Sequence, residues 1–218
     1  MKKQYLVWIA GLLLVLFFVV ATLLHDARKA NKLSGAAKEN AAMLVRDYSP
    51  VKGDPNAKVT IVEFFDPACE TCRAFFPFVE QLMDANPGKI KLVLRYVTFH
   101  EGSDYVVKIL EAAREQGLFW ETLEATFAAQ PAWASHGHPQ PEKLWGYLEG
   151  LGLDVGKAKR EMHNSTITDR IRQDMSDARQ LRVTKTPGYF VNGKPLLQFG
   201  YKQLQRLVET EVADQYTR

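Results

Sequence analysis

Two apolar, strand-like runs with a helical segment between them limit the fold of this chain more than anything else in its sequence. Residues 59–65 read VTIVEFF, a short β-branched and aromatic run typical of a buried central strand. Residues 73–86 follow with helical apolar spacing, and Asn-Pro-Gly at 86–88 ends them. Residues 89–99, KIKLVLRYVTF, alternate as a second strand. Such a β-α-β unit predicts two parallel strands in one sheet.

The segment before this unit, residues 49–58, contains two prolines and a glycine and is predicted to be a loop. After the unit, helical patterns dominate for about eighty residues. Ser103 is the expected cap of the first of these helices, Pro131 the expected end of the second, and Ser165 or Thr166 the expected cap of the last.

The pattern then returns to strands. Residues 188–199, GYFVNGKPLLQF, contain Asn192-Gly193, the strongest short-range signal for a hairpin. We expect this hairpin to join the first two strands in one sheet. Residues 201–216 close the chain as an amphipathic helix.

The N-terminus carries an uncharged apolar run from Leu6 to Leu24, preceded by Lys2 and Lys3. The run is long enough to cross a bilayer as a helix, and it is longer than the apolar core of a cleaved signal peptide. We therefore expect residues 1–25 to be a transmembrane signal anchor. Residues 26–49 are charged and rich in alanine, and we interpret them as a spacer; a first helix of the domain is the alternative.

Composition excludes two classes of protein. A net charge of +3 over 218 residues, without basic stretches interleaved with aromatics, gives no support for nucleic-acid binding. The chain has two cysteines, Cys69 and Cys72, which are too few to staple a domain of this size.

The two cysteines follow the first strand directly, at the start of the predicted helix. The unpaired N–H groups and partial positive charge of a helix N-terminus favour a thiolate at Cys69, and the thiolate is the reactive form. Cys72, one turn further along, is expected to be more buried. A zinc site needs four ligands, and His136 and His138 could supply the others only by folding back. A structural disulfide in so short a loop stabilises little. We therefore favour a redox pair and expect no metal.

The sequence resembles the thioredoxin superfamily, and within it the DsbA-type thiol-disulfide oxidoreductases. The resemblance extends from about residue 50 to the C-terminus and is strongest in SPVKGDPNAKVTIVEFFDPACETC and ARQLRVTKTPGYFVNGKPL. It implies an α/β protein: a thioredoxin fold, residues 50–102 and 184–218, with an inserted helical domain at 103–183, preceded by one N-terminal transmembrane helix. In that branch the inserted domain packs over the active site.

The resemblance also implies roles for individual residues. Glu63 matches a buried carboxylate beneath the second cysteine, and burial raises the pKa of such a group, so that it can exchange a proton with Cys72. Thr186-Pro187 matches the cis-proline loop, which lies beside Cys69 and pairs with an extended substrate. Pro77 matches a proline that has only a structural role.

Glu70-Thr71, the dipeptide between the cysteines, is expected to tune the pKa of Cys69. The strongest oxidants of this branch carry a histidine in that dipeptide, which favours the thiolate. A carboxylate beside Cys69 raises the thiol pKa relative to a histidine neighbour. Because the reduction potential follows the stability of the thiolate, we predict a weaker oxidant than the strongest members.

These features together predict a membrane-tethered thiol-disulfide oxidoreductase in a bacterial inner membrane, single-pass, with its catalytic domain facing the periplasm or cell exterior. The redox-active disulfide Cys69–Cys72 serves in place of a separate cofactor. The expected partners are cysteine-containing protein substrates and a membrane redox partner that recycles the pair. A dithiol oxidase is favoured; a reductase of the same fold and a non-catalytic membrane-anchored peptide-binding module are the alternatives, and an isomerase ranks last.

Overall fold

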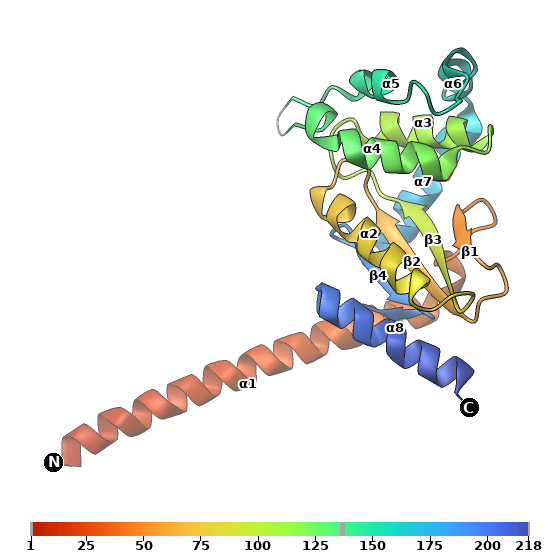
Figure 1. The fold of residues 1–218 in the computed structure, drawn as a ribbon. Helices are drawn as coiled ribbons and strands as arrows, with labels where there is room; N and C mark the ends of the chain where they lie inside the picture. Colours follow the sequence, from red (N-terminus) through yellow and green to blue (C-terminus); the bar gives the residue numbers. More distant parts are fainter. Residues whose placement is uncertain (1, 136–137, 218) are drawn as a thin grey trace.

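A five-stranded sheet forms the centre of the protein (Figure 1). In this computed structural model, which describes residues 2–135 and 138–217, the strand order is β1-β3-β2-β4-β5. The strands are β1 (Val51–Gly53), β2 (Val59–Phe65), β3 (Ile90–Tyr96), β4 (Gly188–Val191) and β5 (Lys194–Pro195). The α-helices are α1 (Lys2–Glu39), α2 (Glu70–Asp84), α3 (Ser103–Arg114), α4 (Phe119–Trp133), α5 (Leu144–Tyr147), α6 (Val155–Glu161), α7 (Ser165–Gln180) and α8 (Tyr201–Tyr216), and short 3-10 helices span Ala41–Met43 and Pro141–Lys143.

The predicted β-α-β unit and hairpin are confirmed. β2 and β3 are parallel over their full length, and α2 connects them. β4 pairs antiparallel with β2 and, through a tight turn, with β5. Asn192 and Gly193 form that turn with φ of 47° and 81°, the left-handed conformation for which this dipeptide is suited.

The prediction of a loop over residues 49–58 is wrong in part, because Val51–Gly53 form β1. This edge strand pairs antiparallel with β3, with Val51 opposite Val93. Three residues that follow a proline and end in a glycine carry no strand signal of their own. The free edge of β3 supplies the hydrogen-bond partners, so tertiary pairing overrides local propensity.

The two faces of β2 are buried against different helices. Ile61 and Phe65 belong to the apolar cluster that contains the cysteines and residues of α2, α4 and α8. Val62 and Phe64 belong to a second cluster, with residues of α7 and the end of α1. Since side chains alternate along a strand, Glu63 points to the same face as Ile61 and Phe65, toward α2.

Three details of the helical segment between β3 and β4 differ from expectation. Gly102, with φ of 79°, is the N-cap of α3, because the Ser103 hydroxyl donates a hydrogen bond to Asp66 instead of capping the helix. Asn164 caps α7 by accepting a hydrogen bond from the N–H of Thr166. α4 continues past Pro131 to Trp133, whose indole is fully buried and donates to the carbonyl of Thr126, two turns back.

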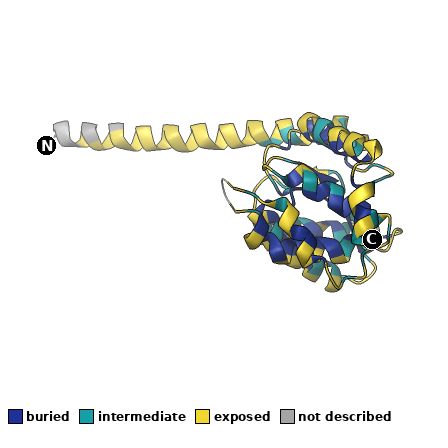
Figure 2. Cartoon of the chain, turned by 90° about the horizontal axis from the view of Figure 1, so that it is seen from above, coloured by how far each residue is buried: buried dark blue, intermediate teal, exposed yellow. Residues whose placement is uncertain are grey.

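α1 is one unbroken helix that projects from the domain (Figure 1). Figure 2 shows exposed residues along most of its length, and buried ones only where it meets the domain. It is long and apolar enough to cross a membrane. Its last turns pack against the domain, since Ala36 and Ala37 are buried and Ala37 joins the cluster beneath β2 and β4. The division of the chain into anchor, spacer and two-part domain stays a prediction.

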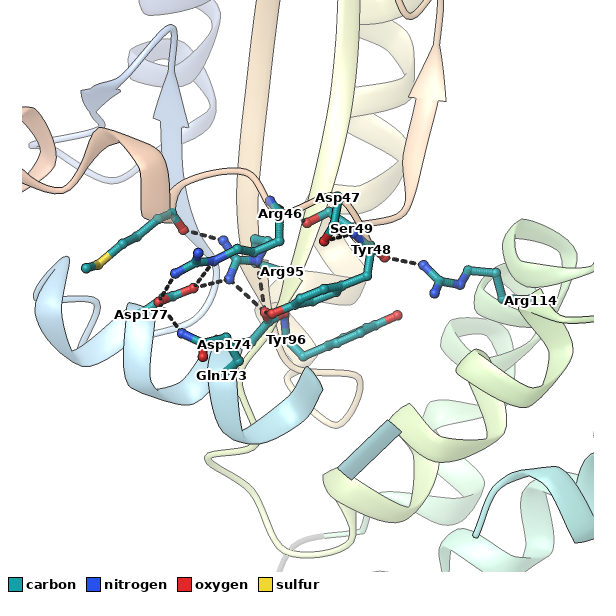
Figure 3. Close-up of polar contacts among 11 residues, drawn as sticks. Arg46, Asp47, Tyr48, Ser49, Arg95, Tyr96, Arg114, Gln173, Asp174 and Asp177 are labelled. Carbon is teal, nitrogen blue, oxygen red and sulfur yellow. Dashed lines mark hydrogen bonds and ion pairs between the residues drawn. The ribbon is translucent and has the colours of Figure 1, made fainter. Parts of the chain in front are cut away.

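A buried ion network fastens the segment after α1 to β3 and α7 (Figure 3). Arg95 of β3 is fully buried and forms ion pairs with Asp174 and Asp177 of α7, at 2.7 and 2.6 Å. Arg46 binds Asp177 through two hydrogen bonds, and the Tyr48 hydroxyl donates to Asp174. The buried carboxylates thus have partners from three parts of the chain, which offsets the cost of burying them.

Candidate active site

The two cysteines lie at the corner where β2 ends and α2 begins. Cys69 is the N-cap of α2, with extended φ and ψ of −76° and 118°, and its N–H donates to the carbonyl of Asp66. Cys72 lies in the first turn and is fully buried. Both side chains are free thiols, so the structure describes the reduced pair.

The surroundings of Cys69 favour its thiolate. A hydrogen bond from Cys72 is the main cause that lowers the pKa of Cys69, to about 5; the Thr186 side chain and the N–H groups of Cys72 and Thr71 add to it, against the opposing effect of burial. The pKa is lowered although Glu70 is the next residue in the chain. With this pKa the Cys69 thiol is ionised at neutral pH, and the thiolate is the reactive form of a cysteine.

Cys72 is held in the opposite state. Burial is the largest cause that raises its pKa well above the usual value of a thiol, and its hydrogen bond to Cys69 and the charges of Glu63 and Cys69 act in the same direction. The pair is therefore asymmetric: one sulfur carries negative charge, and the other retains its proton.

Glu63 lies on the cysteine side of β2, only 2% exposed. It is directly opposite Tyr189 in the β2–β4 register. Burial raises the pKa of Glu63 to about 8, the nearby Tyr189 hydroxyl opposes that shift, and the charge of Cys69 adds to it. Within the described residues neither the Oε2 atom of Glu63 nor the Tyr189 hydroxyl has a hydrogen bond. A carboxyl group in this state can both give and take a proton near pH 7.

Thr186-Pro187 lies beside Cys69, as predicted, and its peptide bond is cis. The distance from Cys69 Sγ to the carbonyl oxygen of Thr186 is 3.4 Å. A cleft of about 460 Å³ opens here, which we call the Pro187 groove; Thr71, Thr186, Pro187 and Phe199 are among the residues that line it. The predicted catalytic and substrate-binding residues therefore meet in one place, and their roles stay proposals.

Two residues that sequence reasoning missed hold the corner in shape. Asp66 is fully buried and accepts hydrogen bonds from the N–H groups of Ala68, Phe99 and His100 and from the hydroxyl of Ser103. It thus joins the ends of β2 and β3 to the start of α3. The one signal available in the sequence was an Asp-Pro turn after a strand.

The second is Gln130 of α4. Its buried amide donates to the carbonyls of Pro67 and Cys69, at 2.8 and 3.1 Å. The helical segment therefore contacts the cysteine loop directly. A single glutamine in an amphipathic helix carries no local signal for such a contact.

The structure gives no geometric support for a zinc site at the two cysteines. Within residues 2–135 and 138–217 no group of three or more His, Cys, Asp or Glu side chains is arranged to hold an ion. His136, which was one of the two candidate ligands, lies outside the described residues.

Comparison with known proteins decides the family. A family model described as Thioredoxin matches residues 46–210. The chain belongs to the thioredoxin family. This match confirms the predicted resemblance to the thioredoxin superfamily, and the similarity to BdbD and to disulfide bond formation protein D, both of Bacillus subtilis, confirms the resemblance to its DsbA-type branch.

Three proteins are similar to this chain to different extents. The crystal structure of a thioredoxin-like oxidoreductase from Silicibacter pomeroyi is 30% identical, with a TM-score of 0.67, over 78% of this chain and 95% of that one. Disulfide bond formation protein D of Bacillus subtilis is 27% identical over 75% of this chain and 77% of its own length. A protein of Salinispora arenicola named Na(+)/H(+) antiporter NhaA 1 is 31% identical over 85% of this chain. This chain spans 28% of that protein's length, so the antiporter's activity is not carried over.

Proposed function

We propose that this protein is a membrane-tethered thiol-disulfide oxidoreductase that exchanges disulfides with extracytoplasmic protein substrates through Cys69 and Cys72. The observation that carries the proposal is the asymmetry of the pair: a thiolate at Cys69, and a buried thiol at Cys72 above a carboxyl group with a pKa near neutrality. The names of the oxidoreductase from Silicibacter pomeroyi and of disulfide bond formation protein D support it.

The reaction follows from the roles of the three groups. In the oxidised protein a substrate thiolate attacks Cys69 Sγ, the Cys69–Cys72 bond breaks, and Cys72 leaves with the electron pair and takes the proton of Glu63. A second substrate thiolate then attacks the substrate sulfur of the mixed disulfide, and Cys69 leaves as a thiolate. Two electrons pass from the substrate dithiol to the cysteine pair, and the substrate gains a disulfide.

The low pKa of Cys69 supports the oxidase direction. A thiolate with a pKa of about 5, compared with the usual 9, stabilises the reduced protein at pH 7 by about 3 kcal/mol, which raises the reduction potential by about 60 mV. A cysteine pair that prefers to be reduced oxidises its substrates. Glu70 favours the alternative, a reductase of the same fold, because a carboxylate between the cysteines makes the pair less oxidising than a histidine at that position would.

The apolar run of α1 supports tethering to a bacterial inner membrane, with the domain in the periplasm or at the cell exterior, where protein disulfides persist. A dithiol oxidase takes two electrons from each substrate and must pass them to an acceptor before it can act again. The proposal therefore includes a membrane redox partner that reoxidises the cysteine pair. No separate cofactor is needed for exchange between sulfurs.

A trapping experiment tests the proposal. Replacing Cys72 with Ala removes the resolving thiol, so Cys69 should accumulate mixed disulfides with its partners in cells. The double variant lacking both thiols is the matched control. Captured dithiol substrates would support the oxidase; absence of any Cys69-linked partner would instead favour the non-catalytic peptide-binding module.

A further inference from the structure

The Pro187 groove has a wall that the thioredoxin domain does not supply. Lys29 and Leu33 of α1 line it, facing Thr71 and Pro187 of the cysteine site. α1 reaches this position because its last turns pack on the domain through Ala36 and Ala37, beside the edge strand β5. Covering a sheet edge with a helix is a common way to protect its unpaired backbone groups.

The groove combines apolar surface with positive charge. Leu197 and Phe199 contribute large, half-exposed apolar side chains. Seventeen described residues line the groove; three of them, Lys29, Arg182 and Lys185, are cations, and none of the seventeen is a carboxylate. A ligand that fits must therefore present apolar side chains together with negative charge.

We propose that α1 is part of the substrate site: Lys29 and Leu33 complete the Pro187 groove, which binds an extended polypeptide segment with apolar side chains and acidic residues next to its reactive cysteine. This inference rests on the proposed function and adds a substrate class to it. It makes the membrane helix a determinant of specificity as well as a tether.

Anionic lipid headgroups are the other acidic groups within reach. Lys29 lies five residues beyond Leu24, which is about 8 Å along the helix axis. A polypeptide fits the groove better, because the cleft is lined by Thr186, whose carbonyl oxygen lies 3.4 Å from the sulfur of Cys69. A headgroup bound there would have no reaction to undergo.

The test uses the full-length oxidised protein in nanodiscs of phosphatidylcholine, a zwitterionic lipid without net charge, and is repeated in nanodiscs that contain anionic phosphatidylglycerol. Two dithiol peptides, identical except for glutamates or lysines beside one cysteine, are mixed with it, and the rate of reduction of the cysteine pair is followed. Lys29→Glu is compared with Lys32→Glu, a change of an exposed lysine on the same helix that does not line the groove. Reduction by dithiothreitol, an uncharged dithiol, checks that each variant has an intact cysteine pair.

We expect the native protein to prefer the acidic peptide. Lys29→Glu should reduce that preference by about two- to five-fold for each unit of charge changed, with a smaller effect at high salt, and Lys32→Glu should leave it unchanged. Equal rates for the two peptides, or equal effects of the two variants, would overturn the inference while leaving the proposed function standing. A preference that arises only in bilayers of anionic lipid would also overturn it. If dithiothreitol reduces the pair and neither peptide does, the proposed function itself fails.

Discussion

Replacing Glu63 with Gln should stabilise the protein, and the gain should depend on pH. The pKa of Glu63 is raised from 4.5 to about 8 by burial, so between these values the folded state holds a proton that the unfolded state has lost. The folded state therefore loses stability as pH rises from about 4.5 to 8. Glutamine has nearly the same shape and does not ionise, so this loss is absent in the variant.

The size of the effect follows from the two pKa values. Proton linkage predicts how far the free energy of unfolding of the variant exceeds that of the native protein. The excess grows from about 1 kcal/mol at pH 5 to about 3 kcal/mol at pH 7 and about 4–5 kcal/mol at pH 8.5, in addition to any effect of the substitution that does not depend on pH. Those energies are large compared with the 5–15 kcal/mol by which typical domains are stable. The gain has a functional cost, since the proton donor for Cys72 is lost and exchange should slow by about 10²-fold or more at pH 7.

Equilibrium unfolding in urea, followed by tryptophan fluorescence on the reduced full-length protein in detergent, measures this difference at each pH. Glu80→Gln is the matched control, because Glu80 is a partly exposed carboxylate of α2 paired with Lys52, and its effect should stay within about 1 kcal/mol. If the native protein and Glu63→Gln lose stability in parallel between pH 5 and 8.5, Glu63 is not the buried acid described here.

Two further changes test other parts of the account. Glu70→His should raise the reduction potential of the cysteine pair by about 30 mV for each unit by which the pKa of Cys69 falls. Equilibration with glutathione measures the potential. An unchanged potential would show that the dipeptide does not tune the pair. Arg95→Met removes a partner of two buried carboxylates, Asp174 and Asp177, and should lower the free energy of unfolding in urea by about 3–5 kcal/mol. Arg172→Met removes an exposed ion pair and should lower it by less than about 1 kcal/mol. Equal losses in the two variants would contradict the importance of burial.

Sequence patterns predicted the parts of the fold that local signals determine. β2 and β3 are long apolar strands, and the Asn192-Gly193 turn has a conformation few other dipeptides adopt readily. The cysteine pair was placed correctly because a strand before it and a helix after it fix its surroundings. β1 was missed, since three residues become a strand only when β3 is beside them.

The long-range contacts that hold the site and the rest of the fold together could not be predicted from the sequence, for a different reason. Gln130 contacts Cys69 across 61 residues, and Arg46 binds Asp177 across 131. Neither side chain differs in its local pattern from an ordinary surface residue. Such contacts depend on how the helical segment and the end of α1 pack on the sheet, which no single stretch of sequence records.

The central claim is that the strand-to-helix corner makes Cys69 a thiolate and keeps Cys72 a thiol. Alkylation of the reduced protein by iodoacetamide across a range of pH, with each site quantified by mass spectrometry, measures both directly. We expect Cys69 to react with a midpoint near pH 5 and Cys72 to stay unmodified at pH 7. A midpoint above pH 8 at Cys69, or equal reaction at the two sulfurs, would contradict the account.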